Sequence, residues 1–329
     1  MAFQLKANEG VGAGITRNVR REIEKALHHL DVKGNPHQSD ARANDAVHEV
    51  RKCFKRVRAA LRLLREDLGD DAYHEYNLCF RDAARPLSEI RDAKMLVESL
   101  DKLTQHSADP SEPGEVAKIR DALLAEQEEV MRGVLTRDRA FMAVEEIARR
   151  ALARTEWKIE RDGWAALEGG LRRVYRAGHR ALRLAVEDPS MANLHEWRKQ
   201  AKYLWHQLQL LEPAWVGCEK ELGDQVHKLS QLLGEDHDLA VLRQTLSARP
   251  LTYGGHRALK GVFGAVDRQR KELERQAFAL GQQFYKDSPR VFTSRVEAYW
   301  RAWTAKVEGT RAGAGSHSAQ GLSRVLPKP

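Results

Sequence analysis

The segment HEVRKCFKRVRAALRLL at residues 48–64 returns as HEWRKQAKYLWHQLQLL at residues 195–211, 147 residues later. The His, the Glu, the Arg, both Lys and the closing Leu-Leu coincide in the two copies. In each copy, apolar residues recur at three- and four-residue spacing, which predicts an amphipathic helix. A repeated helix of this kind indicates that the chain contains two related helical halves.

A second pair of segments supports a duplication. LSEIRDAKML at residues 87–96 matches LGEDHDLAVL at residues 233–242, at an offset of 146 residues. A weaker match relates residues 15–27 to residues 171–183. Two strong matches at nearly the same offset predict a tandem duplication of a helical unit of about 150 residues.

Most of the remaining chain also has the pattern of long helices. Ala, Leu, Glu, Arg and Lys fill the periodic segments, the prolines fall mostly between them, and no alternating strand pattern occurs. We therefore expect an all-α protein with one domain over residues 10–308, in halves of about 10–160 and 161–308. Residues 309–329 are rich in Gly, Ser, Ala and Pro, and we expect a disordered tail there. The helices are expected near residues 15–30, 40–67, 70–100 with a kink at Pro86, 115–132, 137–160, 164–187, 190–211, 215–248, 254–286 and 289–307.

Composition excludes several classes of protein. No stretch approaches the ~18 apolar residues of a membrane span, and the first residues lack the pattern of a secretory signal. Cys53, Cys79 and Cys218 fit neither a disulfide framework nor the paired spacing of a zinc site. We expect a cytoplasmic protein without a cofactor. The net charge of +8 is mild for 329 residues, so the distribution of the positive charge matters more than its sum.

The repeated helices concentrate positive charge on one face. On a helical wheel the cationic residues of each copy form a row opposite the apolar face, and Glu49 and Glu196 lie about 100° from the leading histidine. An ordinary solvated face interleaves charges of both signs, because like charges three or four residues apart destabilise a helix. The row therefore predicts an anionic ligand. Its members are His48, Arg51, Lys52, Lys55, Arg62 and, at the edge, Arg58 in the first copy, and His195, Arg198, Lys199, Lys202 and His206 in the second.

Further cations on neighbouring helices could join the two rows. Arginine binds phosphate oxygens bidentately and lysine acts as a point charge, so mixed rows suit a line of phosphates better than a single carboxylate. A histidine beside a polyanion tends to gain a proton and to donate from both ring nitrogens. The additional candidates are Arg17, Arg20, Arg81, Arg91, Arg173, Arg176, His227 and Lys228.

At these residues the sequence resembles the CHAD family (conserved histidine α-helical domain). The resemblance rests on the two His-x-x-Arg-Lys-x-x-Lys helices and on the segments ending at Asp92 and Asp238, and it covers most of the chain. It implies two four-helix bundles related by a pseudo-twofold axis, with a basic groove or pore between them. It also implies binding of inorganic polyphosphate and association with polyphosphate granules. His237 departs from the family, which more often has arginine there, as at Arg91.

The triphosphatase-like CYTH domain that often accompanies the family is not recognisable here. Its signature is a Glu-x-Glu-x-Lys strand, and this sequence contains no such strand. We therefore expect a stand-alone CHAD protein.

Binding to the RNA or DNA backbone is the main alternative to polyphosphate. Single-strand binders interleave aromatic residues with cations so that bases can stack. We expect Phe54, Trp197 and Trp205 to project toward the apolar side, away from the cations. A charged groove without a stacking platform favours a polyanion that has no bases.

A metal-dependent phosphohydrolase is the weaker alternative. His237-Asp238 is an HD dipeptide, but its counterpart in the first half is Arg91-Asp92, and arginine does not ligate a metal. We expect Asp92 and Asp238 to form local caps or salt bridges, and we expect no catalytic residue and no metal. The glycines of GVGAG at residues 10–14 do not follow a strand, so we expect a flexible lead-in there rather than a phosphate loop.

Overall fold

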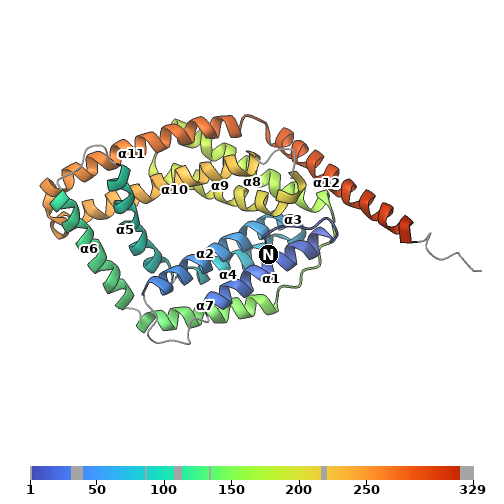
Figure 1. The fold of residues 1–329 in the computed structure, drawn as a ribbon, viewed down its shortest axis with the longest axis horizontal. Helices are drawn as coiled ribbons and strands as arrows, with labels where there is room; N and C mark the ends of the chain where they lie inside the picture. Colours follow the sequence, from blue (N-terminus) through green and yellow to red (C-terminus); the bar gives the residue numbers. More distant parts are fainter. Residues whose placement is uncertain are drawn as a thin grey trace, which may run out of the picture.

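The structure, a computed structural model, describes residues 2–30, 40–85, 87–106, 113–132, 135–215 and 221–318. Within these ranges the chain folds into helices joined by turns and short extended connections, without a β-strand, as the sequence predicts (Figure 1). The helices are α1 (Val11–Leu30), α2 (Asp40–Leu63), α3 (Arg65–Leu68), α4 (Asp70–Ala83), α5 (Ser88–His106), α6 (Pro113–Arg132), α7 (Leu135–Ala153), α8 (Trp164–Glu187), α9 (Met191–Leu211), η2 (Glu212–Trp215), α10 (Glu221–Ala248), η3 (Pro250–Tyr253), α11 (Gly255–Phe284) and α12 (Pro289–Ser318).

The helices pack as two bundles. In the first half, α2 packs against α1 and α4, and α7 closes the bundle by packing against both α1 and α4. In the second half, α9 packs against α8 and α10, and α11 closes the bundle against both α10 and α8. Helices α5 and α6 leave the first bundle and reach α10 and α11 of the second (Figure 1). Each half therefore contains a four-helix arrangement.

The repeated helices α2 and α9 lie at the junction of the two bundles. Their apolar faces are buried, with Phe54 and Trp197 at 1% and 0% exposure. Helix α2 also packs against α8, where a Cβ atom added at Gly170 would lie only 2.0 Å from the carbonyl oxygen of Leu63. The absence of a side chain at Gly170 therefore allows the two halves to approach closely.

Several helix boundaries differ from the sequence-based expectation. Helix α2 ends at Leu63 and not near Asp67, and the short α3 follows it. The expected kink at Pro86 is a full interruption between α4 and α5, whereas the corresponding part of the second half lies within the continuous α10. Helix α7 ends at Ala153, so the expected helix to residue 160 is wrong there.

Other expected segments lie partly outside the described residues. Helix α12 continues to Ser318, into the tail expected from residue 309, and residues 319–329 are outside the described part. The linker residues 107–112 and Cys218 are outside it as well. None of the described helices is long and apolar enough to cross a membrane.

The glycine-rich segment at residues 10–14 forms the first turn of α1. The amide of Val11 donates a hydrogen bond of 2.6 Å to Oδ1 of Asp162, which lies in the extended connection between the two halves. A Cβ atom at Gly12 would lie 2.7 Å from Cβ of Ile159 in the same connection. These glycines allow the connection to pack on α1, so the expectation of a flexible lead-in is wrong.

Candidate anion-binding site

A pocket of about 470 Å³, the main pocket, lies where α2, α5, α9 and α10 meet. Its lining follows the sequence repeat, because most of the residues come in corresponding pairs from the two halves. These pairs are His48 and His195, Arg51 and Arg198, Lys55 and Lys202, Arg91 and His237, Asp92 and Asp238, and Met95 and Val241; Lys52, Trp205 and His206 complete the lining. The structure thus brings together nine of the predicted site residues.

Two lysines of the main pocket have strongly lowered pKa values. Water reaches the ammonium group of Lys55 through the pocket, yet protein atoms crowd around it. This desolvation, followed by the positive charges of Arg51 and Arg198, lowers the pKa of Lys55 to about 7. Desolvation and Arg198 likewise lower the pKa of Lys202 to about 8. Within the described residues, no carboxylate lies within ion-pair distance of either ammonium group.

The two paired arginines of the main pocket each contact a neighbouring helix or its junction. Nη2 of Arg198 lies 3.8 Å from Oδ1 of Asp238, so α9 contacts α10 through this pair. Nη1 of Arg51 donates to the carbonyl oxygen of Ala84 at 3.0 Å and to Oγ of Ser88 at 2.6 Å. Asp238 therefore forms a salt bridge, one of the two roles expected for it, and this salt bridge joins two helices.

Burial raises the pKa of each of these two aspartates, Asp92 and Asp238. The positive charge of Arg51 opposes the increase for Asp92, and that of Arg198 opposes it for Asp238. Their matching positions in the repeated segments were the available signal for placing both residues at the pocket.

The histidines of the main pocket are held toward the neutral form. Desolvation is the largest cause, and it lowers the pKa of His48, of His195 and, to about 4, of His237. The rings of His195 and His237 lie 4.6 Å apart. His206 is 1% exposed; its Nδ1 is 2.9 Å from Oε1 of Gln209, and its Nε2 has no hydrogen-bond partner in the described structure. An anion in the pocket would favour protonation of the exposed histidines.

The cationic rows are less continuous than the helical wheel predicts. Lys52 forms an ion pair of 3.1 Å with Glu49, and Lys199 pairs with Glu196 in the same way. The wheel places the glutamates away from the histidine, but each glutamate is only three residues from its lysine and within its reach. Lys52 still lines the main pocket, whereas Lys199 does not.

Trp205 packs against the hydrophobic core, as expected, but it also lines the main pocket, so its expected position away from the cations is wrong. The ring of His227 stacks on it with centroids 4.1 Å apart, and Nζ of Lys202 lies 4.2 Å from the same centroid. The indole of Trp205 is therefore already engaged by a ring and a cation of the protein itself.

A second pocket of about 380 Å³, the side pocket, lies between α2 and the junction of α4 with α5. It contains the predicted residues Arg58 and Arg81, and it shares Arg51 and Lys55 with the main pocket. Arg85 also lines it. The remaining lining residues are Phe54, Phe80, Asp82, Ala84 and Ser88.

Arg62, a predicted member of the row, is packed between helices. Its guanidinium lies 3.8 Å from the ring centroid of Tyr203 and donates to Oδ1 of Asn77 at 2.8 Å. Desolvation lowers its pKa. Arg62 lines neither pocket, so its role is to join α2, α4 and α9.

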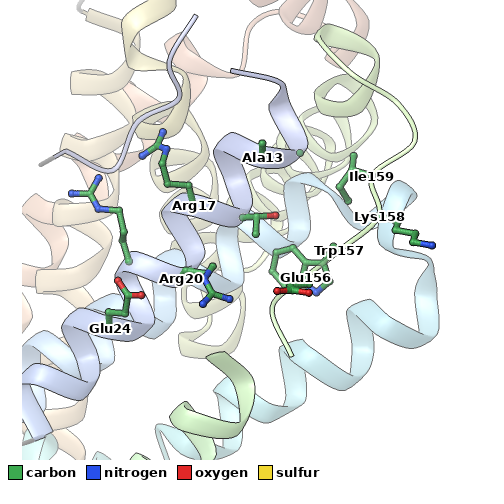
Figure 2. A pocket seen from close by; sticks show the side chains of 11 residues that line it. Ala13, Arg17, Arg20, Glu24, Glu156, Trp157, Lys158 and Ile159 are labelled. Atoms are coloured by element: carbon green, nitrogen blue, oxygen red, sulfur yellow. The ribbon is translucent and has the colours of Figure 1, made fainter. Parts of the chain in front are cut away.

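Arg17 and Arg20 lie away from both pockets, beside a cavity of about 760 Å³ between α1 and residues 156–159 (Figure 2). Arg17 forms an ion pair with Glu9, and Arg20 donates to the carbonyl oxygen of Leu152 at 3.2 Å. In Figure 2 the charged ends of Arg17, Arg20 and Lys158 point in different directions. These cations therefore do not converge on one ligand.

The remaining predicted residues also lie outside both pockets. Arg173 pairs with Glu66 at 3.2 Å, and Arg176 is exposed on α8. His227 is engaged with Trp205, and Lys228 is exposed on α10. In the described part of the chain, no group of three or more His, Cys, Asp or Glu side chains could hold a metal ion.

The fold and the main pocket together define a helical protein with a cation-lined pocket that is built from both copies of the sequence repeat. The family model for the CHAD domain matches residues 21–247, and the chain belongs to this family. Among solved structures, the chain is similar to the crystal structure of the CHAD domain from the plant Ricinus communis. The identity is 15%, the TM-score is 0.45, and the match covers 92% of this chain and 95% of that chain. A comparison with curated proteins found no match.

Proposed function

We propose that this protein binds inorganic polyphosphate in the main pocket without hydrolysing it. The observation that carries the proposal is the crowding of Arg51, Lys55, Arg198 and Lys202 around one pocket. Desolvation, followed by the charges of the neighbouring cations, lowers the pKa of Lys55 there to about 7. Such crowding opposes the charged state of the empty pocket, and a bound polyanion relieves it. A ligand with many negative charges is therefore the natural complement of this site.

The type of cation favours phosphate over carboxylate. Two arginines at related positions supply forks for phosphate oxygens, and the lysines between them supply point charges. The groups come from both halves and surround one pocket, so a ligand that contacts all of them must carry several negative charges. Inorganic polyphosphate has this chemistry, and membership of the CHAD family points the same way.

Binding to RNA or DNA is the second candidate, because both carry phosphates at regular spacing. The contacts of Trp205 with His227 and Lys202 count against it, since this aromatic residue of the main pocket is already engaged by the protein's own side chains. The buried Trp197 is stacked on Phe278 and cannot accept a base. The site therefore suits a phosphate chain without bases better than a nucleic acid.

A competition experiment separates these candidates. Long-chain polyphosphate, single-stranded RNA and duplex DNA compete for the purified protein across a salt series, and orthophosphate release is followed in parallel. We expect polyphosphate to bind most tightly, with an affinity that falls steeply with salt. Equal affinity for RNA contradicts the preference for polyphosphate, and steady orthophosphate release in the presence of a divalent metal contradicts the non-catalytic role.

Charge reversal tests the pocket itself. We expect Lys55→Glu and Lys202→Glu each to weaken polyphosphate binding by about tenfold or more, because each replaces an attractive contact by a repulsive one. The control is Arg176→Glu, which changes the net charge equally on the exposed face of α8. A similar loss in the control means that binding depends on overall charge and not on the pocket.

Location at polyphosphate granules in the cytoplasm belongs to the same proposal and is supported by the family alone. A fluorescent fusion of the protein should co-localise with granules in cells that accumulate polyphosphate. The Lys55→Glu variant should become diffuse, whereas Arg176→Glu should remain with the granules. Retention of both variants at granules means that the main pocket does not direct the protein there.

A further inference from the structure

The side pocket adjoins the main pocket, because the two pockets share two lining residues. Arg51 and Lys55 line both, so the same two cations stand between them. The side pocket adds three further arginines, Arg58, Arg81 and Arg85. The cationic surface of the first half therefore extends beyond the main pocket.

The interruption between α4 and α5 accounts for the position of the side pocket. The chain turns there, with the amide of Arg85 donating to the carbonyl oxygen of Asp82 at 3.1 Å and the amide of Ser88 donating to that of Arg85 at 3.0 Å. The sequence has Pro86 between α4 and α5, whereas the corresponding residue in the second half, Leu232, is buried within the continuous α10. The extension therefore belongs to the first half.

Arg85 is the arginine of the side pocket that is most available to bind a ligand. Arg81 pairs with Asp82 at 2.9 Å, and Nε of Arg58 donates to Oδ1 of Asn77 at 3.0 Å. Arg85 is exposed, and within the described residues it has no ion-pair partner. Its guanidinium can therefore bind an anion without first breaking an ion pair.

We infer that a linear phosphate chain held in the main pocket continues past Arg51 and Lys55 into the side pocket, where Arg85 binds it. The inference rests on the proposed function and adds selectivity for chain length to it. A short oligophosphate takes the main pocket, where cations of both halves surround it. A long chain occupies both pockets and gains the additional contact.

The test compares two ligands, tripolyphosphate and long-chain polyphosphate, on the full-length protein and its variants. Arg85→Glu should weaken binding of the long chain by about tenfold, the value of one charge-assisted contact, and leave binding of tripolyphosphate unchanged. It should also reduce the slope of log affinity against log salt for the long chain by about one, as the loss of one phosphate contact does. Arg176→Glu is the control with the same charge change on α8, outside both pockets.

Each outcome has a separate meaning. Equal losses for both ligands in Arg85→Glu place the side pocket within the primary site and overturn the length selectivity. An unchanged affinity for the long chain relative to Arg176→Glu overturns the extension itself. Failure of the wild-type protein to bind either ligand overturns the proposed function, whatever the variants do. Circular dichroism of each variant verifies that the helices are intact.

Discussion

Lys202 on α9 and Lys55 on α2 stand at corresponding positions of the repeat and line the same pocket, and the charge of Lys202 helps to lower the pKa of Lys55. The two halves thus place like charges together where an ordinary interface would pair opposite ones. Such an arrangement opposes protonation in the empty protein and favours it when an anion binds. Binding, protonation and stability are therefore linked at this pocket.

Polyphosphate affinity should increase as the pH falls from 8.5 to 6. With pKa values of about 7 and about 8, Lys55 and Lys202 are mostly neutral at pH 8.5 and mostly charged at pH 6. Each regained charge-assisted contact contributes about tenfold in affinity. Titration calorimetry at pH 8 in two buffers of different ionisation enthalpy should reveal proton uptake on binding.

Lys55→Arg is the matched control for proton uptake. Arginine stays protonated over this pH range, so the variant should bind polyphosphate with less proton uptake and a flatter pH profile. Proton uptake as large as that of the wild type would assign the protons to other groups, such as His48 and His195, whose pKa values are also lowered.

Removing the charge of Lys55 should stabilise the protein without ligand at low pH. The unfolded chain has an ordinary lysine pKa near 10.5, so between about pH 7 and pH 10 it holds more protons than the folded state. Stability from this group therefore rises with pH over that window and is lowest below pH 7. Thermal unfolding should give Lys55→Met a higher Tm than the wild type at pH 6, with a smaller difference at pH 9.5. A constant difference at both pH values would assign the effect to packing.

Glu49→Gln should strengthen polyphosphate binding, whereas Glu196→Gln should change it less. Each substitution breaks an i,i+3 pair with a lysine, but only Lys52 lines the main pocket; Lys199 does not. Exposed pairs contribute about 0.2–1 kcal/mol, so we expect an increase in affinity of up to about fivefold for Glu49→Gln. Equal increases for the two variants would indicate a general effect of net charge, measurable as equal shifts in the salt series.

The sequence predicts most helices because hydrophobic periodicity and proline positions are local signals. It misplaces the end of α7, where residues 155–162 form a non-helical connection that packs on glycines near the start of α1. Asp162 accepts a hydrogen bond from the amide of Val11 at the start of α1, although the two residues are 151 positions apart in the sequence. No local sequence pattern predicts such a contact. The interruption at Pro86 shows the same limit, since proline marks a disturbance of the helix but not whether the two parts separate.

The sequence predicts the candidate site correctly at positions that match in the two copies of the repeat. His48, Arg51 and Lys55 share a helix face with spacing that their counterparts reproduce, and all six residues line the main pocket. Arg58 and Trp205 occupy equivalent positions about 80° from the row, where the wheel does not decide a direction. The tertiary packing decides it: Arg58 lines the side pocket, whereas Trp205 lines the main pocket. The prediction for Arg17 and Arg20 depended on the weak match between residues 15–27 and 171–183. Both residues lie on α1, beside a cavity separate from the main and side pockets.

The junction of the two halves should be sensitive to a single methyl group. A Cβ atom at Gly170 would lie 2.0 Å from the carbonyl oxygen of Leu63 and 2.6 Å from its Cα atom, so α8 and α2 must move apart in Gly170→Ala. Backbone atoms cannot rotate away as a flexible side chain can, and overpacking of this kind typically costs about 1–3 kcal/mol. Gly223→Ala is the control: a Cβ atom in this α10 position meets nothing within 4 Å, and alanine should stabilise the helix by about 0.5 kcal/mol. Urea denaturation of the two variants should therefore shift the midpoint in opposite directions, and a Gly170→Ala variant as stable as the wild type would contradict the close approach of the two halves.

Because the main pocket is built from residues of both halves, the Gly170→Ala variant should also bind polyphosphate less tightly, even under conditions where it remains folded.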